Sequence, residues 1–208
     1  MNNIIIVGAG GFGREVYQWC QDSFDKSEYK IKGFLSKDKN ELDNFKIDAP
    51  IIGHEDDYEI QSDDRFLIAI GNVDIKKKVV ESLKKKGAKF LSLTHPTAIV
   101  SPNSKVGEGV IICPYSILTD SVEIGDFVML NVYVYCGHDS KVGKYSILSP
   151  YATLNGYATL GDEVFVATHS TITSSKNVGK KSIIGANSLV LHDVPEGSKV
   201  IGVSKSKT

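Results

Sequence analysis

The chain has few of the residues that build disulfide frameworks and no run of residues that could cross a membrane. Its 208 residues include 3 cysteines, 6 prolines, 2 methionines and 1 tryptophan. Cys20, Cys113 and Cys136 form neither an even framework nor a metal-ligand spacing, which favours a reduced, cytoplasmic location. No apolar run approaches the roughly 18 residues of a membrane helix. A strand pattern begins directly after the first residues, so we expect no signal peptide.

The sequence also lacks an excess of charge of either sign. The formal net charge is −1, and no lysine or arginine stripe is interleaved with aromatic residues. We therefore expect neither nucleic acid nor an acidic membrane surface as a partner. With 41% hydrophobic and 24% charged residues, the composition is that of an ordinary globular protein with one large or two small domains.

A repeat of six residues runs from Val100 to Val190. All sixteen positions at this spacing are apolar, and the positions two residues earlier are small or β-branched apart from Lys176. A glycine recurs once in every three repeats, at Gly107, Gly125, Gly143, Gly161 and Gly179. This period does not fit an α-helix, but it fits a solenoid with three short strands in each coil. One glycine per coil predicts a tight corner where a side chain would clash.

Residues 1–93 follow a different pattern, in which strands and helices alternate. Apolar runs predict strands at 4–7, 29–35, 66–70 and 89–93 with a short edge at 50–53, and an amphipathic pattern predicts a helix over 73–86. Such alternation is typical of a small parallel sheet of Rossmann type. Prolines at 96 and 102 mark a boundary. We expect an α/β domain over 1–93 and the solenoid over 94–208, with a short C-terminal tail.

A glycine-rich loop follows the first predicted strand. Gly8, Gly10 and Gly13 give the pattern G-x-G-x-x-G, which lets a phosphate approach the backbone at a helix N-terminus. Dinucleotide-binding folds place an acidic residue about 20 residues further on. Asp38 is the candidate here, although it follows Ser36 and Lys37. Because the segment is short for a dinucleotide fold, a nucleotide-linked substrate is favoured over NAD. The alternative is a structural turn that binds nothing.

The six-residue repeat also predicts which way reactive side chains point. Cys136 occupies a core position and is predicted to be buried, not nucleophilic. His138 and Asp139 follow it by two and three residues and should point outward. A neutral histidine beside a carboxylate is a candidate general base, and an exposed histidine without a role is the alternative. His138 and His169 are nearly two coils apart, so no shared metal is expected, and no G-x-S-x-G elbow indicates a serine nucleophile.

The whole chain resembles the bacterial hexapeptide-repeat sugar acetyltransferases, in the subfamily of sialic acid O-acetyltransferases and N-acetyltransferases of nucleotide-linked 4-amino-6-deoxy sugars. The residues that carry the resemblance are the glycine loop, Gly33 to Leu35, Ala69 to Asn72, His95 to Ala98, Leu130 with Asn131, Gly137 to Asp139, and Gly202. It implies a left-handed parallel β-helix, a homotrimer with active sites between subunits, and acetyl-CoA as co-substrate without a metal.

The resemblance further implies a role for individual residues. His138 would be the general base, and Asp139 would orient it. The nucleotide sugar would be bound by Gly10, Gly11, Phe12, Ser36, Lys37, Gly71 and Asn131, and acetyl-CoA by Gly156, Thr168 and Ala186. Two departures concern the acetyl donor. Ile147 stands where some relatives have a second histidine, and the segment Gly202 to Lys205 lacks the proline found near the end of many relatives.

The expected function is N-acetylation of the amino group of a nucleotide-linked amino-deoxy sugar, a precursor for surface glycans or glycosylated proteins. The amine would attack acetyl-CoA directly, without an acyl-enzyme. One alternative is O-acetylation of sialic acid or a related sugar, and another is a non-catalytic trimeric scaffold that binds a nucleotide sugar. An NAD-dependent enzyme ranks last, because the N-terminal segment offers no catalytic acid–base set of its own.

Overall fold

The computed structural model describes residues 1–203, and the chain divides into two compact units, Met1–Leu93 and the residues from Thr94 onward. The expected C-terminal tail, with Ser204 and Lys205 of the departing end motif, lies outside the described residues. Within residues 1–203, no helix has the length and apolar character needed to span a membrane. Each unit has its own core and is described separately.

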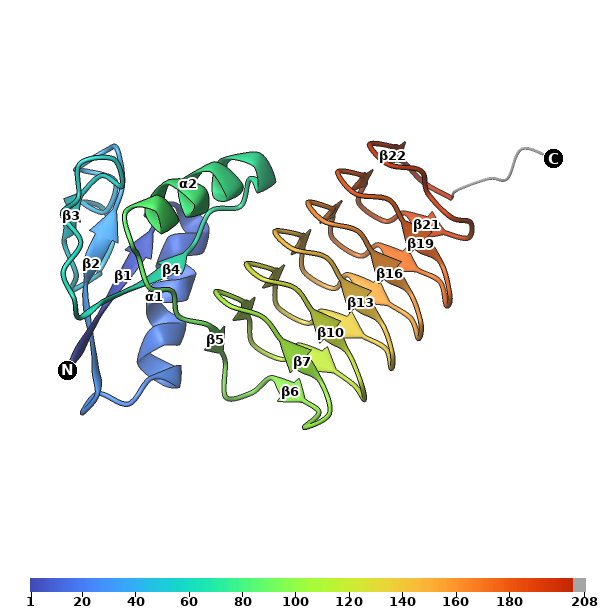
Figure 1. Ribbon diagram of the computed structural model, residues 1–208, viewed down its shortest axis with the longest axis horizontal. Coiled ribbons are helices and arrows are strands. Elements are labelled where there is room, and N and C mark those ends of the chain that lie inside the picture. The colour runs from blue at the N-terminus through green and yellow to red at the C-terminus, as the bar shows by residue number, and fades with distance from the viewer. Residues whose placement is uncertain (204–208) are drawn as a thin grey trace. The chain divides into compact units, whose positions relative to one another are not determined.

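The first unit is built on a parallel sheet of four strands in the order β3-β2-β1-β4 (Figure 1). Its described elements are β1 (Asn2–Val7), α1 (Gly11–Ser23), β2 (Tyr29–Leu35), β3 (Ile51–Gly53), β4 (Asp64–Ile68) and α2 (Val73–Lys85). Ile4, Ile5 and Ile6 in β1 are at most 1% exposed. A continuous apolar run suits a central strand, because both faces of such a strand are covered. The predicted α/β unit with a parallel sheet is confirmed.

The predicted strand over 89–93 is wrong. Only Phe90 pairs with the sheet, through an isolated parallel bridge to Phe66. The next strand, β5 (Leu93–Thr94), belongs to a sheet of the solenoid instead. Residues 89–93 therefore contribute first to the sheet of the first unit, through Phe90, and then to the β-helix, through Leu93. Hydrophobicity alone could not show where the chain changes from one to the other, because both structures bury apolar side chains.

From Thr94 onward the chain forms a left-handed parallel β-helix, which confirms the predicted solenoid. Its short strands pair in parallel with the equivalent strand of the next coil, as Tyr135 does with Thr153. Over the described residues they form three sheets, of which the β6 sheet has β6 (Ile99–Val100), β9 (Ile117–Leu118), β12 (Tyr135–Cys136), β15 (Thr153–Leu154), β18 (Thr171–Ile172) and β21 (Leu189–Val190). The β7 sheet has β7 (Lys105–Val106), β10 (Glu123–Ile124), β13 (Lys141–Val142), β16 (Thr159–Leu160) and β19 (Asn177–Val178). The β8 sheet has β5, β8 (Ile111–Ile112), β11 (Met129–Leu130), β14 (Ile147–Leu148), β17 (Phe165–Val166), β20 (Ile183–Ile184) and β22 (Lys199–Val200).

The core of the β-helix is the predicted row of every sixth residue. From Ile112 to Val190 each of these side chains is at most 4% exposed. The two earliest positions differ from the prediction, since Val100 is half-buried and Val106 is 38% exposed. They lie in β6 and β7, and each of these is the first strand of its sheet. No earlier strand of the same sheet covers them, so the interior is open at that end.

The glycine repeated once per coil lies at a corner where backbones from successive coils nearly touch. A Cβ added at Gly143 would lie 2.3 Å from the carbonyl carbon of Gly161, and one at Gly161 would lie 2.6 Å from the nitrogen of Lys180. No side chain fits at these distances. The predicted reason for the glycine repeat is confirmed.

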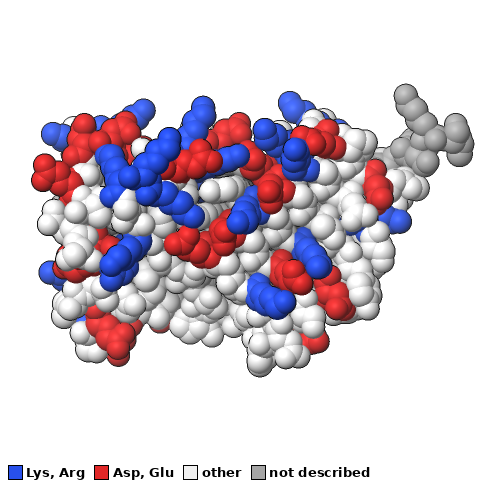
Figure 2. Space-filling view, in the orientation of Figure 1, with Lys and Arg blue, Asp and Glu red and all other residues white. Residues whose placement is uncertain are grey.

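Three edges join the sheets, and each has its own residues. The turns that follow the β8 sheet carry stacked rings of Tyr115, Tyr133, Tyr151 and His169, and we call them the tyrosine edge. The aspartate edge, after the β7 sheet, includes residues 107–109, 125–127, 143–145 and 161–163. The histidine edge, after the β6 sheet, includes residues 101–103, 119–121, 137–139, 155–157 and 173–175. Acidic and basic side chains are interspersed on the face shown in Figure 2, so charge on this face is mixed and not gathered by sign.

Candidate active site

His138 and Asp139 form an outward-facing pair on the histidine edge, as predicted from the repeat. His138 Nδ1 lies 2.9 Å from Asp139 Oδ2, and the side chains are 58% and 44% exposed. Asp139 has a φ of 59°, a left-handed conformation that Ser121, Tyr157 and Ser175 also adopt at the same position of other coils. A carboxylate on Nδ1 favours the tautomer with its proton on that nitrogen. The lone pair is then on Nε2.

The free nitrogen of His138 lies against the next coil, at Gly156. A Cβ added at Gly156 would lie 2.7 Å from His138 Nε2 and 2.8 Å from Cε1. The edge of the His138 ring also contacts Tyr157, with ring centroids 5.0 Å apart and planes at 89°. Gly156 therefore provides the space in which the basic nitrogen lies. The surroundings of Nε2 are a glycine backbone and an aromatic ring, so a substrate atom can reach it.

Gly156 also has a backbone N–H that no group among residues 1–203 accepts, and the same holds for the N–H of His138. Two of the equivalent N–H groups on the aspartate edge, those of Glu108 and Lys144, are satisfied by the following coil, whereas no group among residues 1–203 accepts from Asp162 N. Asp162 Oδ1 accepts from Lys144 N at 2.8 Å, and Asp126 Oδ1 accepts from Glu108 N at 3.1 Å. On the histidine edge the residue one coil after His138 is a glycine, so no side chain is present to accept. The turn thus offers backbone donors beside a base.

Cys136 lies in the core, which confirms its predicted position. Its side chain is 0% exposed, and burial raises the pKa of its thiol to about 12. A thiol in this state carries almost no thiolate near neutral pH, and thiolate is the reactive form. Cys136 therefore cannot serve as an acyl-accepting nucleophile in this fold.

The glycine loop lies between β1 and α1 at the carboxyl end of the sheet. Gly8 has a φ of 101°, and a Cβ at Gly13 would lie 2.1 Å from the Gly8 carbonyl oxygen. Gly10 caps α1 without a side-chain hydrogen bond. The first N–H groups of α1 are therefore available to an anion, as in other phosphate-binding loops. Phe12 packs edge-on against Trp19 at 5.8 Å, which anchors the first turn of the helix.

Two charged residues near this loop were not identified from the sequence. Arg14 lies in the first turn of α1, with its guanidinium 3.7 Å above the centre of the Phe45 ring, and a Cβ at Gly11 would lie 3.9 Å from Arg14 Nη2. Glu41 Oε1 would lie 3.5 Å from a Cβ at Gly10. Arg14 directly follows Gly13 of the glycine motif, and this position could have indicated that its side chain lies near the loop. Glu41 gave no such signal, because a loop brings it back to Gly10.

Ser36 joins this group, whereas Lys37 and Gly71 remain exposed. Ser36 Oγ donates to Glu41 Oε2 at 2.5 Å, so Glu41 Oε1 is the oxygen left facing the glycine loop. Asp38, the acidic residue suggested by spacing, accepts from Asn40 N at 2.9 Å within its own turn. Gly71 follows β4, which neighbours β1 in the sheet, and a Cβ there would meet nothing within 4 Å. The structure thus places the predicted loops after β1, β2 and β4 at one edge of the sheet.

The remaining predicted residues lie on a different edge from His138. Asn131, Thr168 and Ala186 all belong to turns of the tyrosine edge. Thr168 Oγ1 donates to the Pro150 carbonyl at 2.8 Å, and Ala186 is exposed. Ile147 is 3% exposed, so its side chain is not an open surface. Within a single β-helix the structure brings His138, Asp139 and Gly156 together, but it does not bring this second group beside them.

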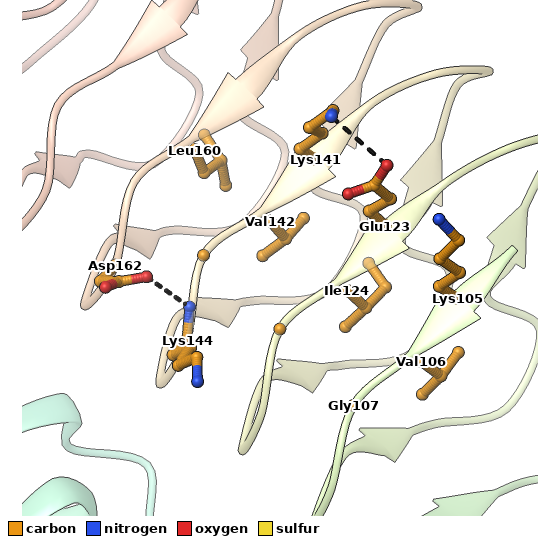
Figure 3. A pocket seen from close by; sticks show the side chains of 12 residues that line it. Lys105, Val106, Gly107, Glu123, Ile124, Lys141, Val142, Lys144, Leu160 and Asp162 are labelled. Carbon is orange, nitrogen blue, oxygen red and sulfur yellow. Dashed lines mark hydrogen bonds and ion pairs between the residues drawn. The ribbon is translucent and has the colours of Figure 1, made fainter.

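A groove of about 410 Å³ follows the outer face of the β7 sheet (Figure 3). Its lining includes no histidine or cysteine, and its charges are largely paired. Lys141 Nζ lies 3.3 Å from Glu123 Oε1, and Lys144 Nζ lies 2.8 Å from Asp126 Oδ2. These residues have no free base to offer, so the groove is a weaker candidate for the reaction than the turn at His138. Among residues 1–203, no group of three or more metal-ligating side chains was found.

Comparison with known proteins finds relatives for both units of the chain. Residues 3–83 match the family described as the PglD N-terminal domain. The first unit is therefore similar to this domain family. The chain is 27% identical over 153 residues to GDP-perosamine N-acetyltransferase of Escherichia coli O157:H7, covering 67% of this chain and 63% of the relative. It is 30% identical over 114 residues to UDP-N-acetylbacillosamine N-acetyltransferase of Bacillus subtilis strain 168, covering 54% of this chain and 51% of the relative. The chain thus matches between half and two thirds of the length of these relatives.

A solved structure matches nearly the whole chain. A variant of perosamine N-acetyltransferase from Caulobacter crescentus, in complex with CoA and GDP-perosamine, superimposes with a TM-score of 0.86 at 22% identity, covering 97% of this chain and 94% of that one. At this identity the match shows the shared fold, an α/β unit followed by a β-helix. The predicted resemblance to acetyltransferases of nucleotide-linked amino sugars is confirmed.

Proposed function

We propose that this protein is an acetyl-CoA-dependent N-acetyltransferase that acts on the amino group of a nucleotide-linked amino-deoxy sugar. The single observation that carries the proposal is the geometry at His138. Its Nδ1 is paired with Asp139, and its Nε2 lies beside Gly156, which has a free N–H. The relatives named as N-acetyltransferases of GDP-perosamine and UDP-N-acetylbacillosamine support the same substrate class.

The chemistry follows from this pair of groups. The sugar amine attacks the thioester carbonyl, a C–N bond forms, and the carbonyl oxygen becomes an oxyanion that the Gly156 N–H can stabilise. His138 Nε2 removes a proton from the nitrogen of the tetrahedral intermediate. The C–S bond then breaks, and the imidazolium returns that proton to the CoA sulfur. General-base assistance of this kind is worth about 100- to 10,000-fold in rate. No acyl-enzyme is needed, which agrees with the buried thiol of Cys136.

The first unit would hold the nucleotide part of the substrate. Gly10, Gly11 and Phe12 provide the helix N-terminus for the diphosphate, and Arg14 adds a positive charge beside it. Glu41 Oε1 is an acceptor for a hydroxyl or N–H of the nucleoside, with Ser36 fixing its other oxygen. Exposed Lys37 and Gly71 border the same edge of the sheet. Residues 1–93 would then bind the nucleotide sugar, and residues 94–208 would carry out acetyl transfer.

The separation of the two edges supports an active site shared between subunits of a homotrimer. Asn131, Thr168 and Ala186 lie on the tyrosine edge, whereas His138 lies on the histidine edge. Two copies that meet with these edges side by side would combine the base of one with the CoA-binding and sugar-binding residues of the other.

The three cysteines are free and buried, which supports the proposed cytoplasmic location.

A thiol-release assay tests the proposed reaction. Purified protein is incubated with acetyl-CoA and a panel of UDP-, GDP- and dTDP-linked amino sugars, and the product is identified by mass spectrometry. We expect release of CoA with one of these acceptors and an amide in the product. His138→Gln should lower kcat by about 100- to 10,000-fold, and His192→Gln, which changes another exposed histidine of the β-helix, should leave kcat near that of the unaltered protein.

The other outcomes identify the rival functions. Release of CoA with sialic acid and an ester product would indicate an O-acetyltransferase. Nucleotide-sugar binding, seen as a rise in melting temperature, without CoA release from any acceptor would indicate a non-catalytic scaffold. Near-normal turnover by His138→Gln would exclude that residue as the base.

Mixing two inactive variants tests the shared site. His138→Gln lacks the base, and Ala186→Arg places a large cation on the tyrosine edge. If sites form between copies, subunits mixed by denaturation and refolding should regain activity, because some interfaces combine two intact edges. Absence of regained activity in mixed trimers, or a monomer by analytical ultracentrifugation, would contradict the proposed arrangement.

A further inference from the structure

Glu41 places a carboxylate beside a loop that suits phosphate groups. Its Oε1 would lie 3.5 Å from a Cβ at Gly10, directly before the N-terminus of α1. A negative charge at this point opposes the binding of an anion by the same helix N-terminus. The carboxylate therefore suits a ligand that brings a hydrogen-bond donor next to its phosphates, such as a hydroxyl.

The loop between β2 and β3 holds this carboxylate in a fixed position. Glu41 N donates to the Asp38 carbonyl at 3.3 Å, and the next side chain, Leu42, is buried and anchors the turn. Ser36 Oγ, directly after β2, donates to Glu41 Oε2 at 2.5 Å. Among residues 1–203, no group donates a hydrogen bond to Oε1. One oxygen is thus held by the protein, and the other faces the glycine loop.

A nucleotide-linked sugar has three kinds of donor near its phosphates. The amino sugar has hydroxyls, but its amine reacts at His138 of the β-helix in the proposed function, which leaves the nucleoside for the first unit. The N–H groups of a guanine edge are two parallel donors that match both oxygens of a carboxylate, whereas Ser36 already occupies one of them. The vicinal 2′- and 3′-hydroxyls of ribose fit better, because a single carboxylate oxygen has two lone pairs and the ribose is bonded directly to the diphosphate.

We propose that Glu41 binds the ribose hydroxyls of the acceptor, so that the amino sugar is linked to a ribonucleoside diphosphate and not to a 2′-deoxynucleoside diphosphate. This inference rests on the proposed function, which supplies the nucleotide-linked substrate. A hydroxyl that donates to a carboxylate forms a charge-assisted hydrogen bond, which is stronger than a bond between neutral groups. A 2′-deoxyribose lacks one of the two donors. UDP- and GDP-linked sugars are therefore expected to bind more tightly than dTDP-linked sugars.

Calorimetric titration of the full chain with UDP, GDP and their 2′-deoxy forms tests this role. Glu41 is half-buried, so water can replace a missing hydroxyl in part. We expect the ribonucleotide of at least one base to bind about 10-fold more tightly than its 2′-deoxy form. In Glu41→Ala this ratio should fall to about 1, because neither form can use the carboxylate. Ser36→Ala keeps the charge but lets the carboxylate move, so its ratio should lie between these values.

Asp38→Asn is the matched control. Asp38 is the acidic residue that the sequence spacing indicates, but its Oδ1 accepts from Asn40 N at 2.9 Å within its own turn. Its substitution should leave the preference for the ribonucleotide at about 10-fold. A preference that is lost in Asp38→Asn and kept in Glu41→Ala would assign the ribose to Asp38 and overturn the inference.

Inorganic pyrophosphate separates recognition of the ribose from support of the glycine loop. It has no ribose, so the carboxylate of Glu41 only repels it. Glu41→Ala should bind pyrophosphate as tightly as the unaltered protein or about 2-fold more tightly, while it binds the preferred ribonucleotide about 10-fold more weakly. Parallel loss of pyrophosphate and nucleotide binding would show that Glu41 only supports the loop, which would contradict the proposed contact.

The same titrations distinguish this inference from the proposed function. A ribose preference that depends on Glu41, without CoA release from any acceptor, would support the inference and count against the reaction. Equal affinities for the ribo and 2′-deoxy forms would overturn the role of Glu41 even if the protein transfers acetyl groups. A preference for GDP over UDP that Glu41→Ala abolishes, and that 2′-deoxy substitution leaves unchanged, would assign the carboxylate to guanine instead. Binding of none of the nucleotides would overturn both the ribose contact and the proposed nucleotide site.

Discussion

The histidine edge and the aspartate edge are built from the same repeat, yet they treat the same backbone group differently. On the aspartate edge, Asp126 and Asp162 accept N–H groups from the coil before them. On the histidine edge, Gly156 leaves the N–H of His138 without an acceptor among residues 1–203, and the His138 ring lies over the glycine. A regular solenoid provides its own reference, so a turn in which a glycine replaces a capping side chain and lies against a histidine ring is a candidate for function.

The strongest test of this comparison introduces a side chain into the histidine edge. Gly156→Ala adds a Cβ that would lie 2.7 Å from His138 Nε2, so the ring must move. We expect kcat to fall by about 10- to 100-fold, because displacement of a reacting group by about 1 Å can cost that much. Steady-state kinetics with acetyl-CoA and the identified acceptor measures the change.

Ser174→Ala serves as its control, since residue 174 occupies the equivalent position one coil later. Ser174 is exposed, and its substitution should leave kcat and melting temperature unchanged. If Gly156→Ala kept full turnover, the turn around Nε2 could not be the reaction site.

The reverse experiment removes a cap from the aspartate edge. Asp162→Ala leaves the N–H of Lys144 without its 2.8 Å acceptor, and we expect the free energy of unfolding to fall by about 1 kcal/mol. Asp162→Asn keeps an oxygen at this position and should recover most of the loss. Urea denaturation measures both values, and kcat should be unchanged in both variants. A loss of kcat without a loss of stability would mean that the aspartate edge takes part in the reaction.

The smallest effect is expected on the tyrosine edge. The Tyr151 ring stacks between Tyr133 at 4.8 Å and His169 at 4.6 Å, whereas Tyr115 has a single stacked ring, Tyr133, at 5.1 Å. The tyrosine rings are about half exposed, so Tyr151→Ala should lower the free energy of unfolding by about 0.5 to 1 kcal/mol. Tyr115→Ala should lower it by about half as much. Equal losses in thermal denaturation would show that ring stacking does not set the stability of this edge.

The solenoid was predictable from the sequence because its period is strict and its core row has no insertion. The same repeat placed Cys136 inside and His138 outside, and both positions are confirmed. It could not reveal that Val106 is partly exposed, since a repeat says nothing of where stacking begins. It also could not show that Gly156 lies against Nε2, because that contact depends on how the ring leans between coils.

The first unit was less predictable in its binding loops than in its sheet. The strand and glycine motif were clear, because both depend on neighbours in the sequence. Glu41 was missed and Asp38 was suggested in its place, since a spacing rule assumes a standard turn after β2. Here Asp38 closes its own turn, and the loop returns Glu41 toward Gly10. Long-range returns of this kind leave no periodic signal.

The parallel register between coils limits the changes in length that the β-helix can tolerate. Tyr135 pairs with Thr153, and Thr153 pairs with Thr171, each one coil further along the chain. Inserting or deleting one or two of the six-residue repeats would preserve the apolar row but transfer every later turn to a different edge. A change of one complete coil would keep each turn on its own edge and alter only the length of the rod. Natural variants of such a protein should therefore differ in length within this region by whole coils.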